Sequence, residues 1–251
     1  MSDVCFTIMF QVNGFAPKIA EIIFMKKEKI YKNGQTKLTD EYQISMGGTM
    51  EIINCIQGTD EWHSIRAGMV TASNYSKVIN KKTGRGLYLR KCASGRMLGI
   101  PEESYKNAIM ERGNETERQA KEEYEARNFC KIQQVGFVKR DEYVGASPDG
   151  LIGDDGVLEI KCPLASTHIS TILKNKIDTV YIPQVQFLLW VTERKYCDYV
   201  SYAPLLVNRP YFCIRVPRDE TYIEAVAKNV DNFVQELKEM IDKVNDFSGT
   251  F

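Results

Sequence analysis

The sequence is poor in the residue patterns from which zinc sites and disulfide frameworks are built. Its seven cysteines are scattered, at positions 5, 55, 92, 130, 162, 197 and 213, and none forms a CxxC pair. The two histidines, His63 and His168, have no partner at a ligand spacing. This pattern argues against a zinc knuckle and against a disulfide framework, and it is typical of reduced thiols in a cytosolic protein.

Long apolar runs and an excess of one charge are also missing. The longest apolar stretches, such as CFTIMF, are too short to span a bilayer, and no basic-then-apolar leader opens the chain. Lys and Arg number 33, as do Asp and Glu, so the formal net charge is zero. A local basic groove can still exist on such a protein. We therefore expect a soluble cytoplasmic protein without a membrane partner, and nucleic-acid binding stays open.

The pattern of the chain changes near residue 50. Residues 1–49 contain two stretches that could be strands, but neither keeps a regular period, whereas the sequence is strongly patterned from Met50 onward. We expect residues 1–49 to be an N-terminal extension of uncertain status and residues 50–251 to form a single domain. An equally open alternative is that Met50 is the natural start.

Periodicity and turn residues predict an α/β arrangement after residue 50. Helices are expected over 60–67, 71–80, 104–128, 178–192 and 219–244, and strands near 132–139, 143–147, 150–152, 157–162, 195–204 and 211–217. The segment 81–86 (KKTGRG) is expected to be a basic loop, and GDDG at 153–156 a tight turn.

The hairpin SPDGLIGDDGVLEIKCP places charged residues where a half-buried strand would have few. Side chains two residues apart on a strand point the same way, so Glu159 and Lys161 share one face, while Leu158 and Ile160 share the other. Asp149 lies just before the turn. Either this face is a solvated ion pair or the acids form a metal site.

The helix expected over 104–128 adds a third acid. Met110, Gly113, Glu117, Ala120 and Tyr124 are spaced by three or four residues and form one apolar stripe with Glu117 at its centre. The charged residues elsewhere on this helix, including Arg118, Lys121 and Glu125, are expected to be solvated. Burying an unpaired carboxylate costs several kcal/mol, roughly, unless it is paired or binds a metal. A slightly rotated stripe, with Glu117 reaching solvent, is the alternative.

Three carboxylates and one lysine at one point suit phosphodiester hydrolysis. Mg²⁺ prefers oxygen ligands, and Asp149 and Glu159 could hold one ion together with the backbone carbonyl of Ile160. Glu117 would serve a second ion or its waters. A metal lowers the pKa of bound water, and the ammonium of Lys161 can orient that water and stabilise negative charge.

These motifs resemble a known nuclease family. SPDG followed by LEIKCP resembles the PD-(D/E)xK nuclease motif. Four ordered blocks resemble lambda exonuclease and the YqaJ-like viral recombinases: QGTDEWHSIRAGMVTAS, GNETERQA, SPDGLIGDDGVLEIKCP and PQVQFLLWVT, which together cover most of 57–192. The resemblance implies a restriction-endonuclease-like core, in which a central mixed β-sheet is flanked by helices.

The resemblance also implies an activity and partners. It implies an exodeoxyribonuclease that uses two Mg²⁺ ions, for which Mn²⁺ can substitute. Such an enzyme degrades the 5′-ended strand of double-stranded DNA ends and leaves 3′ overhangs. A ring-shaped homotrimer, a single-strand annealing recombinase as partner, and a phage or prophage gene in a bacterial host are implied as well.

Individual residues match the family's motifs. Glu117, Asp149, Glu159 and Lys161 match its active-site positions. Four further residues match its 5′-phosphate and backbone contacts, namely Arg66, Ser73, Ser147 and Gln184. Each has a structural alternative: a helix-face cation for Arg66, a helix cap for Ser73, a turn hydroxyl for Ser147 and a buried amide paired with the backbone for Gln184. Thr167 and His168 stand near the position where lambda exonuclease has a DNA-clamping arginine, so the preference for a 5′-phosphate is open.

Other functions remain as alternatives. One is a PD-(D/E)xK nuclease of another kind, either an endonuclease or a RecB/Cas4-type enzyme. Iron–sulfur members of the latter group carry closely spaced C-terminal cysteines, whereas Cys197 and Cys213 are far apart. The other is a DNA-end-binding module without catalysis, although all four active-site residue types are present.

Overall fold

The computed structural model describes the backbone of residues 6–10, 18–30, 36–45, 50–80, 82, 84–100 and 108–249, and the side chains of those from 50 onward except 108–114. The chain divides into two compact units, Met1–Thr49 and Met50–Phe251. The first contains three antiparallel strands in the order β1-β2-β3, namely β1 (Phe6–Phe10), β2 (Lys18–Ile30) and β3 (Thr36–Ser45). Its status as an extension stays a prediction.

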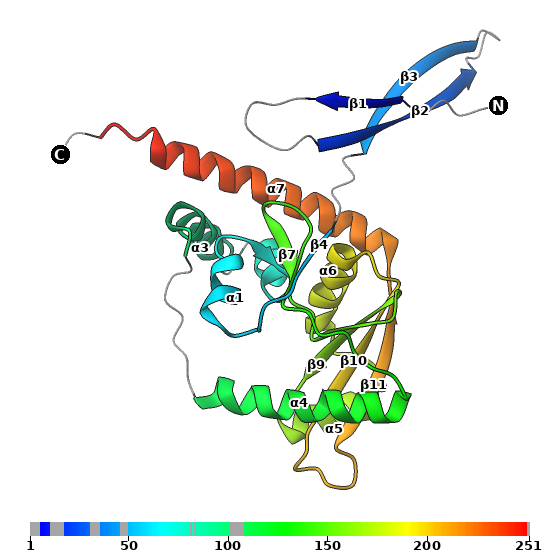
Figure 1. The fold of residues 1–251 in the computed structure, drawn as a ribbon, viewed down its shortest axis with the longest axis vertical. Helices are drawn as coiled ribbons and strands as arrows, with labels where there is room; N and C mark the ends of the chain where they lie inside the picture. The colour runs from blue at the N-terminus through cyan, green and yellow to red at the C-terminus, as the bar shows by residue number, and fades with distance from the viewer. Residues whose placement is uncertain are drawn as a thin grey trace. The chain divides into compact units, whose positions relative to one another are not determined.

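The second unit contains two mixed four-stranded sheets (Figure 1). One has the order β11-β10-β9-β8, built from β8 (Gly150–Ile152), β9 (Gly156–Lys161), β10 (Tyr196–Tyr202) and β11 (Tyr211–Pro217). The other has the order β4-β6-β7-β5, built from β4 (Glu51–Ile53), β5 (Val70–Thr71), β6 (Phe137–Lys139) and β7 (Val144–Ala146). The pairs β9–β10 and β5–β7 are parallel and the others antiparallel.

Helices flank both sheets, as the predicted α/β class requires. They are α1 (Asp60–Ile65), the 3-10 turn η1 (Ala72–Asn74), α2 (Tyr75–Ile79), α3 (Arg85–Leu98), α4 (Ala108–Asn128), α5 (Ala165–Lys174), the 3-10 turn η2 (Thr179–Tyr181), α6 (Ile182–Thr192) and α7 (Glu220–Asn245). None of the helices within the described residues is both long and apolar enough to cross a bilayer. The prediction of a mixed sheet flanked by helices is confirmed.

The main core surrounds α6. Apolar side chains cover this helix on all sides and are fully buried, which is typical of a helix enclosed by protein. It packs against α7, α2 and the sheet strands β7 and β9. The stripe predicted on the last helix is confirmed, because the α7 residues Ile223, Val226, Val230, Phe233 and Leu237 are buried.

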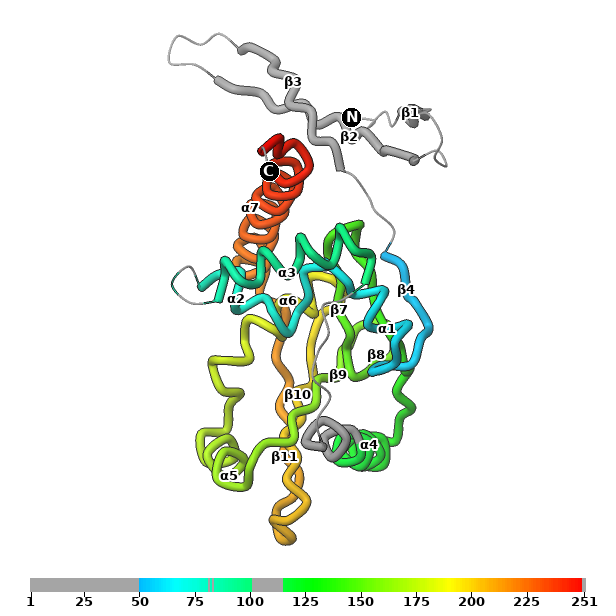
Figure 2. The backbone as a smooth tube through the Cα atoms, turned by 90° about the vertical axis from the view of Figure 1, so that its left-hand side faces the viewer, coloured from blue at the N-terminus to red at the C-terminus, as the bar shows by residue number. Residues whose placement is uncertain are grey.

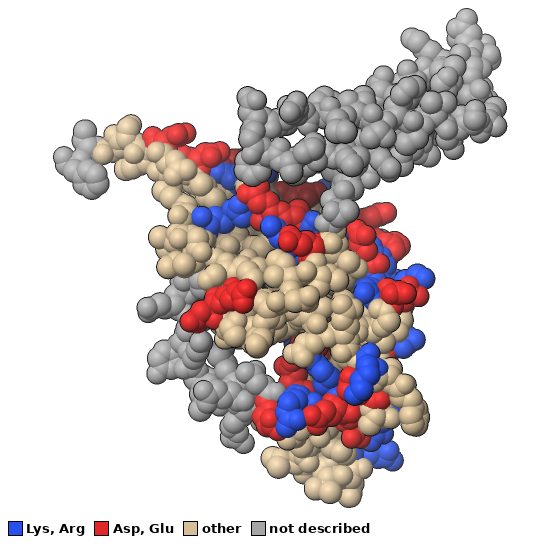
Figure 3. Space-filling view, in the orientation of Figure 1, with Lys and Arg blue, Asp and Glu red and all other residues tan. Residues whose placement is uncertain are grey.

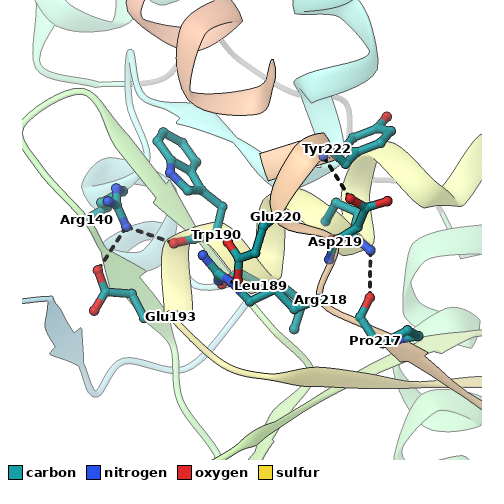
Figure 4. Close-up of polar contacts among 10 residues, drawn as sticks. Arg140, Leu189, Trp190, Glu193, Pro217, Arg218, Asp219, Glu220 and Tyr222 are labelled. Carbon is teal, nitrogen blue, oxygen red and sulfur yellow. Dashed lines mark hydrogen bonds and ion pairs between the residues drawn. The ribbon is translucent and has the colours of Figure 1, made fainter. Parts of the chain in front are cut away.

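Two arginines hold the C-terminal end of α6 (Figure 4). Arg140 Nη1 donates to the carbonyl oxygen of Trp190 at 2.8 Å, and Arg218 Nη1 donates to that of Leu189 at 2.5 Å. The last carbonyls of a helix have no partner within it, so cationic donors at this end satisfy them. Trp190 is 7% exposed and belongs to the main core.

A second, smaller core lies beneath α4. Ala120 and Tyr124 pack on Leu158 and Ile160 of β9 and on Val200 of β10. The alternate residues of these strands, including Val157, belong to the main core with α6. Figure 2 shows α4 and α5 on opposite sides of β9 and β10. The sheet that carries the β8–β9 hairpin is therefore covered on both faces near its end.

The structure contains two helices that the sequence pattern did not predict, α3 and α5. In α3, Gly95 interrupts the periodicity, but a Cβ there would lie 2.4 Å from the backbone nitrogen of Gly68, so this close approach requires glycine. The strand predicted near 132–139 is shorter, since β6 covers only Phe137–Lys139. The helix predicted over 71–80 consists of a 3-10 turn followed by the short α2.

Candidate active site

The hairpin holds Asp149 by its backbone and by its side chain. The backbone nitrogen of Asp149 donates to the carbonyl oxygen of Leu158 at 3.1 Å. Its carboxylate oxygen Oδ2 accepts from the backbone nitrogen of Ile160 at 2.5 Å. The next residue, Gly150, is needed because a Cβ there would lie 2.0 Å from Cγ2 of Ile132. Asp149 is therefore held directly against β9, beside Glu159.

Glu159 is buried, with 2% of its surface exposed. Its Oε1 accepts from Lys161 Nζ at 2.6 Å and from Gln184 Nε2 at 2.5 Å. Its Oε2 is buried and has no hydrogen-bond partner among the residues that the structure describes. The prediction that Glu159 and Lys161 share a face is confirmed, and the alternative of a solvated outer face is wrong for the glutamate. Gln184 is a partly buried amide, but it pairs with this side chain and not with the backbone as its alternative required.

Glu117 approaches the two hairpin acids from α4. It is partly buried, and it is close enough to Asp149 for its negative charge to raise the pKa of that carboxyl group. On the same helix Ala120 and Tyr124 are 0% and 1% exposed, so the described half of the predicted stripe does face the sheet. The side chains of Met110 and Gly113 lie outside the described residues.

Burial and mutual repulsion raise the pKa values of the three acids. Burial raises the pKa of Asp149 to about 7, with a contribution from Glu117. Burial likewise raises the pKa of Glu159 to about 7, with a contribution from Asp149, and it raises the pKa of Glu117. Burial opposes the charge of Lys161, but the carboxylate of Glu159 keeps its pKa above the usual value. The three carboxyl groups of the site, when ionised, thus carry more negative charge than the single ammonium of Lys161 neutralises.

The donor set fits a hard divalent cation. A buried carboxylate oxygen without a partner is costly, and an ion with oxygen ligands would satisfy Oε2 of Glu159 and offset the repulsion from Asp149. Among the described side chains, no three Asp, Glu, His or Cys residues already surround a common point as metal ligands. Asp149 and Glu159 are the central pair, and the role of the Ile160 carbonyl stays a prediction.

Arg66 forms a second, cationic part of the site. Its guanidinium lies over the ring of Trp62, 4.0 Å from the centroid, and Nη1 donates to Oγ of Ser147 at 2.7 Å. Trp62 Nε1 donates to the same hydroxyl oxygen at 2.8 Å. Burial lowers the pKa of Arg66 to about 10, and no carboxylate among the described residues pairs with it. The alternative of a simple helix-face cation is wrong for Arg66.

This arginine is suited to bind an anion beside the acids. Ser147 is two residues before Asp149, so the hydroxyl that contacts Arg66 is on the same short segment as the candidate metal ligand. A partly buried guanidinium with free donor positions binds phosphate well, because its planar fork matches phosphate oxygens. Trp62 is four residues before Arg66, and this spacing on one helix face indicates the contact.

Ser73 and His168 lie outside this group of contacts. Ser73 is exposed in η1, where neither η1 nor α2 has a side-chain cap, so its capping role is wrong. Ser73 makes no hydrogen bond to Arg66 or Ser147 within the described part of the chain. His168 is buried: Nε2 donates to the carbonyl oxygen of Arg209 at 2.9 Å, and Nδ1 lies 2.7 Å from Oγ of Ser201. His168 therefore has a structural role and does not replace a DNA-clamping arginine.

Comparison with known proteins gives concordant matches. The YqaJ-like viral recombinase domain matches residues 61–195. The alkaline exonuclease LHK-Exo from Laribacter hongkongensis is 38% identical with a TM-score of 0.70, over 74% of this chain and 96% of that one. Its complex with dAMP matches at 39% identity, a TM-score of 0.70 and the same coverage.

A more distant structure agrees in fold. A phage-related exonuclease from Haemophilus somnus 129PT is 15% identical with a TM-score of 0.52, over 70% of this chain and 96% of that one. No sequence among the curated proteins matches the chain. The family match covers more than half of the sequence, and the 38% identity to LHK-Exo extends over most of both proteins. The chain therefore belongs to the YqaJ-like viral recombinase family and is a homologue of a lambda-exonuclease-like alkaline exonuclease.

Proposed function

We propose that the protein is a Mg²⁺-dependent exodeoxyribonuclease that degrades the 5′-ended strand of linear double-stranded DNA and leaves 3′ overhangs for recombination. The observation that carries this proposal is the buried carboxylate of Glu159. One of its oxygens is held by Lys161 and Gln184, the other is unpaired, and Asp149 lies beside it. Such an arrangement is unfavourable in a purely structural role and suits a cation-assisted hydrolase.

Each residue has a distinct role in this proposal. Asp149 and Glu159, with the carbonyl of Ile160, would hold Mg²⁺ or Mn²⁺, and Glu117 would serve a second ion or its waters. A bound metal lowers the pKa of water and offsets the negative charge of the phosphate. The ammonium of Lys161 is close enough to Glu159, at 2.6 Å, to orient the attacking water beside it.

The partly buried Arg66 supports the proposed preference for DNA ends. Arg66 and Ser147, joined at 2.7 Å, form a preorganised donor pair for a terminal 5′-phosphate, and Ser73 is kept as a weaker candidate for a neighbouring phosphate. A site that binds a terminal phosphate favours ends over internal positions. With Thr167 exposed and His168 buried, the end is held mainly by Arg66.

The remaining family features are part of the same proposal. They are a ring-shaped homotrimer, a single-strand annealing recombinase as partner, and action in the cytoplasm of a bacterial host on phage or prophage DNA. The name of the Haemophilus relative, a phage-related exonuclease, supports the phage setting. Mass measurement of the native protein tests the trimer directly.

The activity is tested with linear duplex DNA labelled at one 5′ end. The duplex is used with and without a 5′-phosphate, in Mg²⁺ or EDTA, beside closed circular DNA. Lys161→Ala is the inactive variant, and Lys228→Ala, an exposed position on α7, is the matched control. We expect Mg²⁺-dependent release from 5′ ends by the native protein and the control only.

Other outcomes would select the alternatives. Cutting of closed circles would indicate an endonuclease of the PD-(D/E)xK type. Binding to ends without cleavage would indicate a DNA-end-binding module. Release from 3′ ends would contradict the proposed polarity.

A further inference from the structure

One lysine on α4 is close to the candidate site but has no role in it so far. Lys121 is four residues after Glu117, and side chains at this spacing are neighbours on one side of a helix, with about 5–6 Å between their Cβ atoms. The helix packs with β9 and β10, the strands that carry the site. Lys121 was expected to be solvated, but it is partly buried.

The charged side chains that the structure describes on the outer surface of α4 have partners of their own. Its outer surface mixes acidic and basic side chains (Figure 3), where Arg118 pairs with Glu115 and Glu122. Glu125, one turn after Lys121, accepts from Lys131 Nζ at 3.1 Å and from the backbone nitrogen of Ile132 at 2.8 Å. In the described part of the chain, no hydrogen bond or ion pair engages the ammonium of Lys121.

The charge of Lys121 acts on the site. It lowers the pKa of Glu117 and of Asp149, after burial and repulsion have raised both, so the ammonium lies within electrostatic reach of these acids. Of the other two described cations near the site, Lys161 is held by Glu159, and Arg66 is assigned to the terminal phosphate. The ammonium of Lys121 is therefore available, among the described side chains, to meet the backbone of a polyanionic substrate.

We propose that Lys121 binds a backbone phosphate of the DNA strand next to the phosphate that is hydrolysed at the carboxylates. This inference rests on the proposed nuclease function. An ammonium carries three donors and acts as a point charge, so it contributes affinity for the backbone without reading the base sequence. Its position one helical turn from Glu117 places that contact on the α4 side of the site, whereas Arg66 would hold the terminal phosphate from α1.

The experiment compares Lys121→Met with Lys121→Arg and Lys228→Met. Methionine removes the charge and keeps an unbranched stem, arginine keeps the charge, and Lys228 is an exposed lysine on α7, a helix that packs with α3 and α6. Binding of a 5′-phosphorylated duplex is measured by fluorescence anisotropy in EDTA, between about 50 and 200 mM salt. Rates in Mg²⁺ then separate KM from kcat, and circular dichroism and thermal unfolding establish that each variant is folded.

For Lys121→Met we expect a roughly three- to tenfold weaker affinity and a similar rise in KM, with little change in kcat. The slope of log affinity against log salt should become shallower by about 0.9, the value for one phosphate contact on duplex DNA. Lys121→Arg should restore both quantities, and Lys228→Met should match the native protein.

The inference and the proposed function fail in different ways. If the native protein shows no Mg²⁺-dependent degradation, the proposed function is wrong. If the native protein is active and Lys121→Met has an unchanged salt slope and KM, the inference is wrong. A loss confined to kcat would also overturn it, because it would mean that Lys121 acts through the carboxylates and not on a DNA phosphate.

Discussion

Replacing Asp149 by asparagine tests whether the site is built at the expense of stability. Asparagine keeps an oxygen that can accept from the backbone nitrogen of Ile160, so the 2.5 Å contact has a neutral substitute. It removes the negative charge that faces Glu117 and Glu159. In the absence of metal we expect Asp149→Asn to be more stable than the native protein at alkaline pH.

The magnitude follows from the pKa of Asp149. Burial, with repulsion from Glu117, raises this pKa from 3.8 to about 7. Between pH of about 4 and 7 the unfolded chain has lost the proton while the folded chain keeps it, so the free energy of unfolding falls as pH rises. The full shift corresponds to a ceiling of about 4 kcal/mol, at about 1.4 kcal/mol for each unit of pKa. Because a partly buried site relaxes and admits water, we expect a gain of about 2 kcal/mol for the variant above neutral pH.

The assay is urea unfolding in EDTA at a series of pH values, followed by circular dichroism. Below pH of about 4 the two proteins should have equal stability, since Asp149 is then protonated in both states. At pH of about 8.5 the variant should have the higher free energy of unfolding. In a thermal unfolding experiment at this pH, its melting temperature should be roughly 4–8 °C above that of the native protein. Adding Mg²⁺ should stabilise the native protein more than the variant, because binding to the folded state alone raises stability.

Two results would refute this reasoning. A variant that is equally or less stable than the native protein across the whole pH range would mean that the carboxylate of Asp149 is not under electrostatic strain. A constant difference at all pH values would mean that the substitution acts through packing. Loss of nuclease activity is expected in every case and does not decide between them.

Three further predictions concern the support of the site. Arg66→Lys should reduce the preference for 5′-phosphorylated over unphosphorylated ends about tenfold, because lysine lacks the planar fork of the guanidinium. Initial rates on the two duplexes measure this preference, and an unchanged ratio of rates would contradict the role of Arg66. Tyr124→Phe removes the 2.7 Å hydrogen bond from the Tyr124 hydroxyl to Asp198, which joins α4 to β10. In urea titrations the free energy of unfolding should fall by about 1.5 kcal/mol, and an unchanged stability would show that this bond does not stabilise the fold. Gly136→Ala would place a Cβ 2.3 Å from the carbonyl oxygen of Cys55. We therefore expect the free energy of unfolding to fall by about 2 kcal/mol or more in the same titration, whereas an unchanged value would show that the backbone around Cys55 can move to make room.

The sequence alone was enough to predict the parts of this protein that depend on local periodicity. The period of a strand is two residues, so Glu159 and Lys161 had to share a face of β9. The apolar stripe of α7 and the turn between β8 and β9 follow from the same kind of pattern. The helix α3 did not, because Gly95 is placed there for a contact with Gly68, 27 residues earlier, that no local period reveals.

The burial and the pairing of the site were decided only by the tertiary structure. Glu159 is covered because α6 brings Gln184 to it from 25 residues away, and Arg66 meets Ser147 across 81 residues. Such contacts depend on how whole helices pack on the sheet, which charge spacing along the chain does not specify. Local sequence therefore determined which side chains share a face of a strand or helix. Packing determined which of these side chains are removed from water and placed beside like charges, and this burial is what raises the pKa values of the carboxylates and makes them candidates for catalysis.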